Sequence, residues 1–204
     1  MNRLLHIVSS PRGSASQSLT LAHTFIDAYR EAHPGAEVNT FDLWDGTLPS
    51  FGPTAVAARA GVLAGRPLVG QQASVWQSIT QTYARFAEHH GYLFSVPVWN
   101  GDVPYVLKQF IDVVSQPRLL LDVHEEGVAP APALTGKKAA VIYASDGWGP
   151  GSVREDGTCL EKWLRWVGVR DIDAVFSHHH PAAEETDLTH RRAWNHARQA
   201  GLAF

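Results

Sequence analysis

Short apolar runs alternate along the chain with longer segments in which apolar residues recur every three or four positions. The runs predict five strands, at Leu4–Val8, Glu37–Leu43, Tyr92–Trp99, Lys137–Ser145 and Asp171–Phe176. The longer segments predict helices over residues 17–32, 72–90, 104–114, 159–167 and 182–200, with Leu188 on the apolar side of the last one. Strands that alternate with helices favour a parallel sheet, because parallel neighbours need a long crossover connection.

The expected fold class is α/β. We expect a flavodoxin-like, doubly wound, five-stranded parallel sheet in the order 2-1-3-4-5, with helices on both faces. The larger dinucleotide-binding fold would need a glycine fingerprint that this sequence lacks. Residues 1–204 are expected to form a single domain with two excursions. The first, near residues 45–70, is rich in Gly and Pro and holds one short helix from Thr54; the second, near residues 117–135, is an irregular hairpin or loop.

Composition narrows the class of protein further. Of 204 residues, 45% are hydrophobic and 18% charged, which is typical of a globular chain. The net charge of −3 gives no basic footprint for nucleic acid, and no apolar run reaches the length of a membrane span. Cys159 is the single cysteine, so no internal disulfide can form. The first residues, MNRLLHIVSS, lack a signal-peptide core, and we expect a cytoplasmic protein without membrane contact.

The predicted topology points to three loops as the ligand site. Ligands of such sheets bind beyond the carboxyl ends of the strands, at the switch in strand order. The loops at residues 9–18, 97–103 and 145–151 meet there. The first loop breaks from a strand into small residues before a helix, which makes an anion cradle of hydroxyls and unpaired N–H groups. Its candidate phosphate-binding residues are Ser10, Ser16, Gln17 and Ser18, with Arg12 as a source of charge.

The second and third loops combine an aromatic ring with polar groups. The second offers Trp99 beside Asn100 and the Gly101 backbone, and the third offers Ser145, Asp146, Gly147 and Trp148. Each loop alone could also have a purely structural role: the first as a serine-rich cap, the second as a tryptophan packed in the core, and the third as a glycine-rich turn. Together they favour a phosphorylated, broad planar ring such as FMN, since the sequence lacks the Walker lysine of nucleoside triphosphate sites.

Three segments, SSPRGSASQS, PVWNGDVPYVLKQFIDVV and LTGKKAAVIYASDGW, resemble the FMN-dependent NAD(P)H azoreductases and quinone oxidoreductases of the flavodoxin-like fold. The resemblance spans nearly the whole chain. It implies a homodimer with two FMN sites at the interface and a ping-pong reaction, in which NAD(P)H reduces the flavin and the flavin reduces an azo compound or a quinone. The resemblance assigns FMN binding to Ser10, Ser16, Gln17, Ser18, Pro97, Val98, Trp99, Asn100, Gly101, Ser145, Asp146, Gly147 and Trp148. Many relatives carry an aromatic residue in place of Gly101 and a glycine in place of Trp148, so an aromatic wall has moved between loops.

The resemblance leaves the chemistry to the flavin, and we expect no catalytic side chain. A flavodoxin-like electron carrier and a flavin-binding sensor without turnover stay as alternatives. No residue pattern reads a 2′-phosphate, so NADH and NADPH are both possible co-substrates. The run His178–His180 after the last strand is not expected to bind metal, because consecutive side chains point in different directions. Whether these histidines border the site is open.

Overall fold

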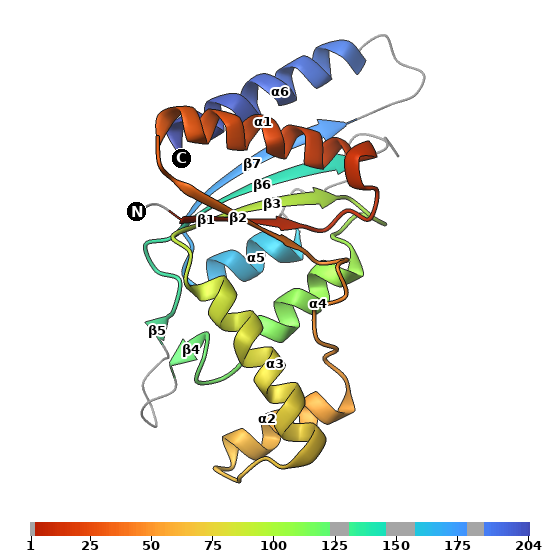
Figure 1. The fold of residues 1–204 in the computed structure, drawn as a ribbon. Coiled ribbons are helices and arrows are strands. Elements are labelled where there is room, and N and C mark those ends of the chain that lie inside the picture. The colour runs from red at the N-terminus through yellow and green to blue at the C-terminus, as the bar shows by residue number, and fades with distance from the viewer. Residues whose placement is uncertain (1–2, 123–130, 146–157, 179–185) are drawn as a thin grey trace.

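The computed structural model describes residues 3–122, 131–145, 158–178 and 186–204. Five parallel strands form its main sheet: β1 (Arg3–Val8), β2 (Glu37–Asp42), β3 (Gly91–Pro97), β6 (Lys138–Ser145) and β7 (Asp171–His178). Their order is β2-β1-β3-β6-β7, which is the predicted order 2-1-3-4-5 (Figure 1). The strand order therefore reverses between β1 and β3, and their carboxyl ends mark the expected ligand edge.

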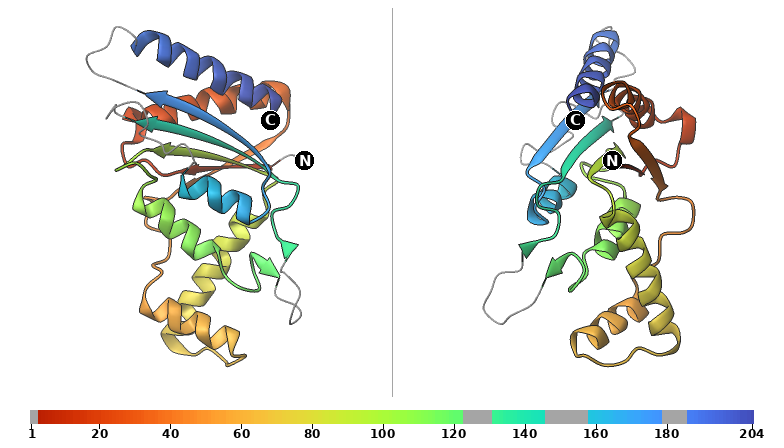
Figure 2. Two further views of the ribbon diagram at one scale, coloured as in Figure 1. Left: turned by 180° about the vertical axis from the view of Figure 1, so that it is seen from behind. Right: turned by 60° about the vertical axis from the view of Figure 1, so that its left-hand side comes forward.

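Helices cover both faces of the sheet. On one face lie α1 (Gln17–Ala32) and α6 (Thr186–Ala203), side by side in both orientations of the molecule (Figures 1 and 2). On the other face lie α3 (Gly70–Ala87), α4 (Tyr105–Val114) and α5 (Cys159–Trp166). Each face of the sheet has its own hydrophobic core, and alternate residues of a strand belong to different cores. Leu4 and Leu93 pack against α1 and α6, whereas Leu5 and Phe94 pack against the helices on the opposite face. Because the central strands are buried on both sides, they read as continuous apolar runs in the sequence.

The contact between α1 and α6 depends on a glycine. A Cβ added to Gly201 would lie 2.3 Å from the carbonyl oxygen of Phe25, so the two helix backbones approach more closely than any larger residue allows. The predicted apolar position of Leu188 is wrong, since its side chain is 53% exposed. Small residues make the buried side of α6 instead, namely Ala193, Ala197 and Ala200.

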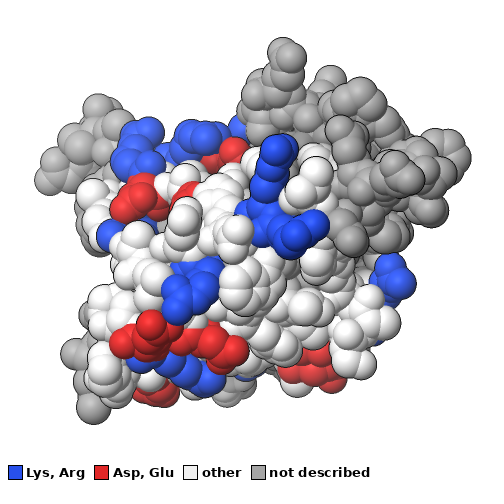
Figure 3. Space-filling model, turned by 90° about the horizontal axis from the view of Figure 1, so that it is seen from above, with Lys and Arg blue, Asp and Glu red and all other residues white. Residues whose placement is uncertain are grey.

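The short helix and the hairpin predicted in the two excursions are both present. The first contains α2 (Pro53–Leu63), which packs beside α3 and projects with it away from the sheet (Figure 1). The second contains a two-stranded antiparallel pair, β4 (Leu121–Asp122) and β5 (Ala131–Pro132), which confirms the hairpin interpretation. In the described ranges, no helix has the length and apolar character needed to cross a membrane. The surface seen from the α1 and α6 side carries small groups of both charge signs (Figure 3).

Candidate cofactor site

The start of α1 forms the predicted anion cradle. Ser16 is the N-cap residue, and its hydroxyl accepts a hydrogen bond from the Leu19 N–H at 3.4 Å and lies 3.1 Å from the Ser18 hydroxyl. A short 3-10 turn, Gly13–Ala15, leads into the cap, and the φ of +53° at Gly13 favours glycine there. The chain thus turns sharply from strand to helix and stacks its hydroxyls at the helix entrance.

This entrance is electrostatically suited to a phosphate. The N–H groups of Gln17 and Ser18 belong to the first helical turn, where α-helix geometry provides no intrahelical acceptor. The aligned peptide dipoles of a 16-residue helix add partial positive charge at the same point. The hydroxyls of Ser10, Ser16 and Ser18 belong to buried residues, so a hydrogen bond from them to an anion would be little weakened by water.

A hollow of about 50 Å³ joins the first predicted loop to the second. The lining residues are Ser10, Arg12, Ser16, Gln17, Ser18, Pro97, Val98, Trp99 and Ala144. Seven of the predicted site residues therefore surround one space, together with Arg12 and with Ala144 of β6. The volume is small beside the roughly 300–1,000 Å³ of ordinary small-molecule pockets. Its size suits the phosphate end of a mononucleotide, and Trp99 would offer an apolar surface to the rest of such a ligand.

Asn100 and Gly101 form a tight turn at the end of β3. Trp99 and Asp102 exchange two backbone hydrogen bonds, of 2.8 and 3.0 Å, and φ is +52° at Asn100 and +81° at Gly101. Positive φ at both central residues is what a type I′ hairpin turn requires, and Asn-Gly is its preferred sequence. This turn was not predicted from the sequence, although the Asn-Gly pair is a direct signal for it.

Three aromatic rings gather beside the hollow. The Trp44 ring lies 6.3 Å from that of Trp99 and 5.5 Å from that of Tyr105, between ring centroids. The Trp44 indole N–H also donates to the Ser9 carbonyl at 3.0 Å, which ties the segment after β2 to the cradle. Trp99 is 36% exposed, so the predicted alternative of a fully buried tryptophan is wrong. Sequence reasoning missed Trp44, because it follows an edge strand away from the switch point.

The end of β6 brings a histidine to the predicted site residue Ser145. The Ser145 hydroxyl lies 2.9 Å from Nδ1 of His178, which is its partner in register on β7. The His178 ring also stacks on Phe176, whose ring stacks in turn on Tyr143. His178 therefore borders a residue of the third predicted loop. Asp146, Gly147, Trp148, His179 and His180 lie outside the described residues.

One buried hydroxyl on β7 has no hydrogen-bond partner among the described residues. The Ser177 hydroxyl is buried and makes no hydrogen bond to the described part of the chain. Ser177 is in register with Ala144, which lines the hollow, so both residues occupy the same face of the sheet. Buried hydroxyls are normally hydrogen-bonded, and this one belongs to the strand neighbour of a lining residue. The serine-rich, helix-capped donor set and the apolar Trp99 wall together fit FMN.

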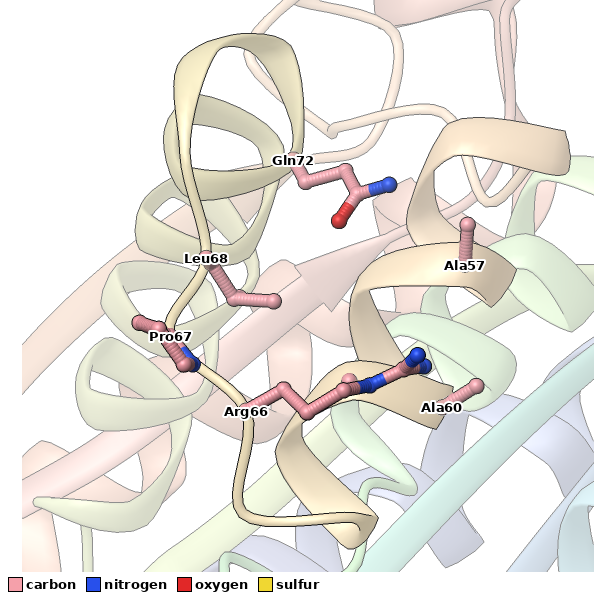
Figure 4. Close-up of a pocket in the computed structure, with 7 residues that line it drawn as sticks. Ala57, Ala60, Arg66, Pro67, Leu68 and Gln72 are labelled. Atoms are coloured by element: carbon pink, nitrogen blue, oxygen red, sulfur yellow. The ribbon is translucent and has the colours of Figure 1, made fainter.

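Larger hollows of about 390 and 510 Å³ lie at the other end of the molecule, between α2 and the start of α3. Figure 4 shows the first, in which the Arg66 side chain runs toward α2 and Gln72 points into the space from α3. Small apolar side chains, including Ala57 and Ala60, form most of its remaining wall. Volume alone would favour these hollows, but their lining lacks the group of serine hydroxyls and the aromatic ring of the smaller one. We therefore assign the candidate site to the carboxyl edge of the sheet.

Comparison with known proteins agrees with this fold. A family model described as flavodoxin-like fold matches residues 2–198. The chain is 41% identical to FMN-dependent NADH:quinone oxidoreductase 9 of Burkholderia lata, over 86% of each chain. It is 36% identical to FMN-dependent NADH:quinone oxidoreductase of Nitratidesulfovibrio vulgaris, over 86% of this chain and 85% of that protein. The crystal structure of an azoreductase from Bacillus anthracis superposes with a TM-score of 0.87 and 22% identity, over the full length of both chains.

These matches define a flavodoxin-like protein by fold and by sequence. The chain belongs to the family of FMN-dependent NADH:quinone oxidoreductases, as the resemblance in its three segments predicted.

Proposed function

We propose that this protein is an FMN-dependent NADH oxidoreductase that reduces quinones, azo compounds or both. The observation that carries the proposal is the single hollow in which a serine-lined helix entrance meets the exposed Trp99. The names of the relatives at 41% and 36% identity support the same activity, and they favour NADH as the co-substrate. A structure of an FMN-dependent NADH-azoreductase from Bacillus anthracis in complex with FMN shares the fold, with a TM-score of 0.85.

In this proposal the chain binds and orients the cofactor. Ser10, Ser16 and Ser18 hold the phosphate with the first N–H groups of α1, and Trp99 provides an apolar surface for the ring. When bound, FMN supplies the hydride acceptor and donor, so NADH and the quinone or azo substrate react in turn, in a ping-pong sequence. Ser145, beside the third loop, would hydrogen-bond at the polar edge of the site.

No side chain of the described site is required as a nucleophile. Cys159, at the start of α5, is the one thiol in the sequence. Partial burial and the neighbouring Asp102 carboxylate raise the pKa of this thiol to about 11. It therefore stays protonated at neutral pH and is a poor nucleophile. The Asp102 carboxylate is engaged in accepting hydrogen bonds from the Val103 and Cys159 N–H groups, at 2.8 and 3.3 Å.

The active unit in this proposal is a cytoplasmic homodimer with two FMN sites at its interface. The family resemblance is the main support. Large apolar side chains that are more than half exposed on α2 and before α3 also support it, namely Val56, Leu63 and Val69. Sedimentation analysis of the FMN-loaded protein would test this part, and a purely monomeric protein that turns over NADH and quinone would refute it.

One anaerobic experiment tests the activity. Purified protein reconstituted with FMN should be yellow, should lose its absorbance near the flavin maximum when NADH is added, and should regain it with a quinone. A protein that cannot take up FMN would rule out the proposal. A yellow protein that NADH fails to bleach would instead favour the electron carrier or the sensor, since those need no reaction with the nicotinamide.

A further inference from the structure

Gln17 is a flexible part of the lining of the phosphate hollow. Ser10, Ser16 and Ser18 have short side chains whose hydroxyls belong to buried residues. Gln17, at the same helix entrance, has three rotatable side-chain bonds and is only partly buried. An unrestrained glutamine would lose that rotamer freedom when it ordered around an anion, which weakens binding. Its amide could also present the oxygen rather than the nitrogen to the phosphate.

A residue 173 positions away restrains this side chain. The Gln17 amide nitrogen lies 3.0 Å from Nδ1 of His190, on the second turn of α6. Both side chains are partly buried, and α6 packs along α1 over much of its length. The contact therefore links the helix that opens the phosphate hollow to the neighbouring helix on the same face of the sheet.

The chemistry of the pair leaves a donor for the anion. The amide nitrogen carries two hydrogens, and Nδ1 of a neutral imidazole can accept one of them. The other hydrogen remains for an oxygen acceptor in the hollow that Gln17 lines. This arrangement fixes the amide nitrogen, rather than the amide oxygen, on His190 and leaves its second hydrogen for the anion.

We propose that His190 is a positioning residue for the cofactor phosphate, acting through Gln17. The proposal rests on the proposed function, because it takes the ligand of the hollow to be the phosphate monoester of FMN. It goes further in assigning part of the discrimination between FMN and riboflavin, which lacks the phosphate, to a side chain of α6. His190 itself does not line the hollow.

Fluorescence titration with both flavins tests the proposal on the full-length protein. We expect His190→Ala to weaken FMN binding roughly 3- to 10-fold, the range that corresponds to ordering one long side chain on binding. Riboflavin binding should stay within about twofold of the wild type, because that ligand places no phosphate beside Gln17. His190→Gln, which can still hydrogen-bond the Gln17 amide, should recover part of the FMN affinity and serves if the alanine variant folds poorly.

Two further variants separate positioning from general damage to α6. In a Gln17→Ala background, His190→Ala should cause no additional loss of FMN affinity, because the interaction it supports is already absent. His196→Ala is the matched control: His196 lies on the same helix with its ring 3.1 Å from Asp173, and it is no part of the hollow. It should leave binding of both flavins unchanged.

Equal weakening of FMN and riboflavin by His190→Ala, unchanged FMN affinity, or a full additional loss in the Gln17→Ala background would each overturn the proposal. A wild-type protein that binds neither flavin would instead refute the proposed function itself. The two failures are thus distinguishable in one set of titrations.

Discussion

Replacing Ser16 with aspartate separates cofactor binding from folding at a single position. Aspartate caps helices about as well as serine, and its charge interacts favourably with the N-terminal dipole of α1. The Ser16→Asp variant should therefore fold, with a melting temperature equal to or above that of the wild type. In the hollow, however, it places a carboxylate where the proposed function puts a phosphate.

The size of the effect follows from the geometry. Ser16 is 3% exposed, and its hydroxyl is 3.1 Å from that of Ser18, so a phosphate oxygen held by this pair would lie within hydrogen-bond distance of both. Two unit charges about 4 Å apart repel by roughly 4 kcal/mol at an effective dielectric constant near 20. Since about 1.4 kcal/mol corresponds to a factor of ten, FMN affinity should fall roughly a thousandfold.

The assay is quenching of flavin fluorescence, with FMN and riboflavin titrated in parallel. Riboflavin should bind Ser16→Asp nearly as it binds the wild type. Ser14→Asp is the matched control, because Ser14 lies on the same loop but is exposed, and water screens a charge there. If FMN affinity in Ser16→Asp stays within about fivefold of the wild type, the hollow does not hold the phosphate and our reasoning is wrong.

Three further outcomes are expected. Trp99→Ala should weaken FMN and riboflavin alike, roughly tenfold, because the ring surface it removes is common to both; selective loss of FMN would contradict its place beside the ring. Burial lowers the pKa of His6 to about 4, so the unfolded chain takes up a proton before the native protein does and stability falls as pH drops from about 6.5 toward 4. Between pH 7 and 4.5, the free energy of unfolding measured with urea should fall by about 2.5 kcal/mol less in His6→Gln than in the wild type. An equal fall in both proteins would argue against a neutral buried imidazole. Gly201→Ala should lower the free energy of unfolding by about 1–3 kcal/mol, because its Cβ meets the Phe25 carbonyl; an unchanged free energy of unfolding would contradict the close approach of α1 and α6.

The strand order could be predicted from the sequence because a parallel sheet covered on both faces leaves a strong local pattern. β3 and β6 are almost wholly buried, and both were found as apolar runs, although β3 ends at Pro97, two residues before the predicted end. The helix α2 was predicted to begin at Thr54, but its end could not be predicted. Its sequence, PTAVAARAGVL, has small residues on every side and little polar contrast, so helical periodicity is weak even though Ala55 and Ala58 are buried.

The candidate site could be predicted from the sequence where the strand order alone determines which loops lie together. Residues after β1 and β3 had to converge at the switch point, and Ser16 and Trp99 do line one hollow. Trp44 reaches the same region through the packing of an edge strand, and His190 reaches it through the crossing of α1 and α6. Neither contact leaves a local pattern in the sequence, because each depends on the packing of two elements that are distant in the sequence.

The turn at Asn100 and Gly101 has a consequence for redesign of the acceptor range. A planar side chain grafted at position 101 would have to adopt φ near +81°, and that conformation costs non-glycine residues about 1–2 kcal/mol. The graft would therefore distort the hairpin before it altered selectivity. Libraries aimed at new dyes or quinones should leave this dipeptide intact and vary the neighbouring rings at Trp44, Trp99 and Tyr105 instead.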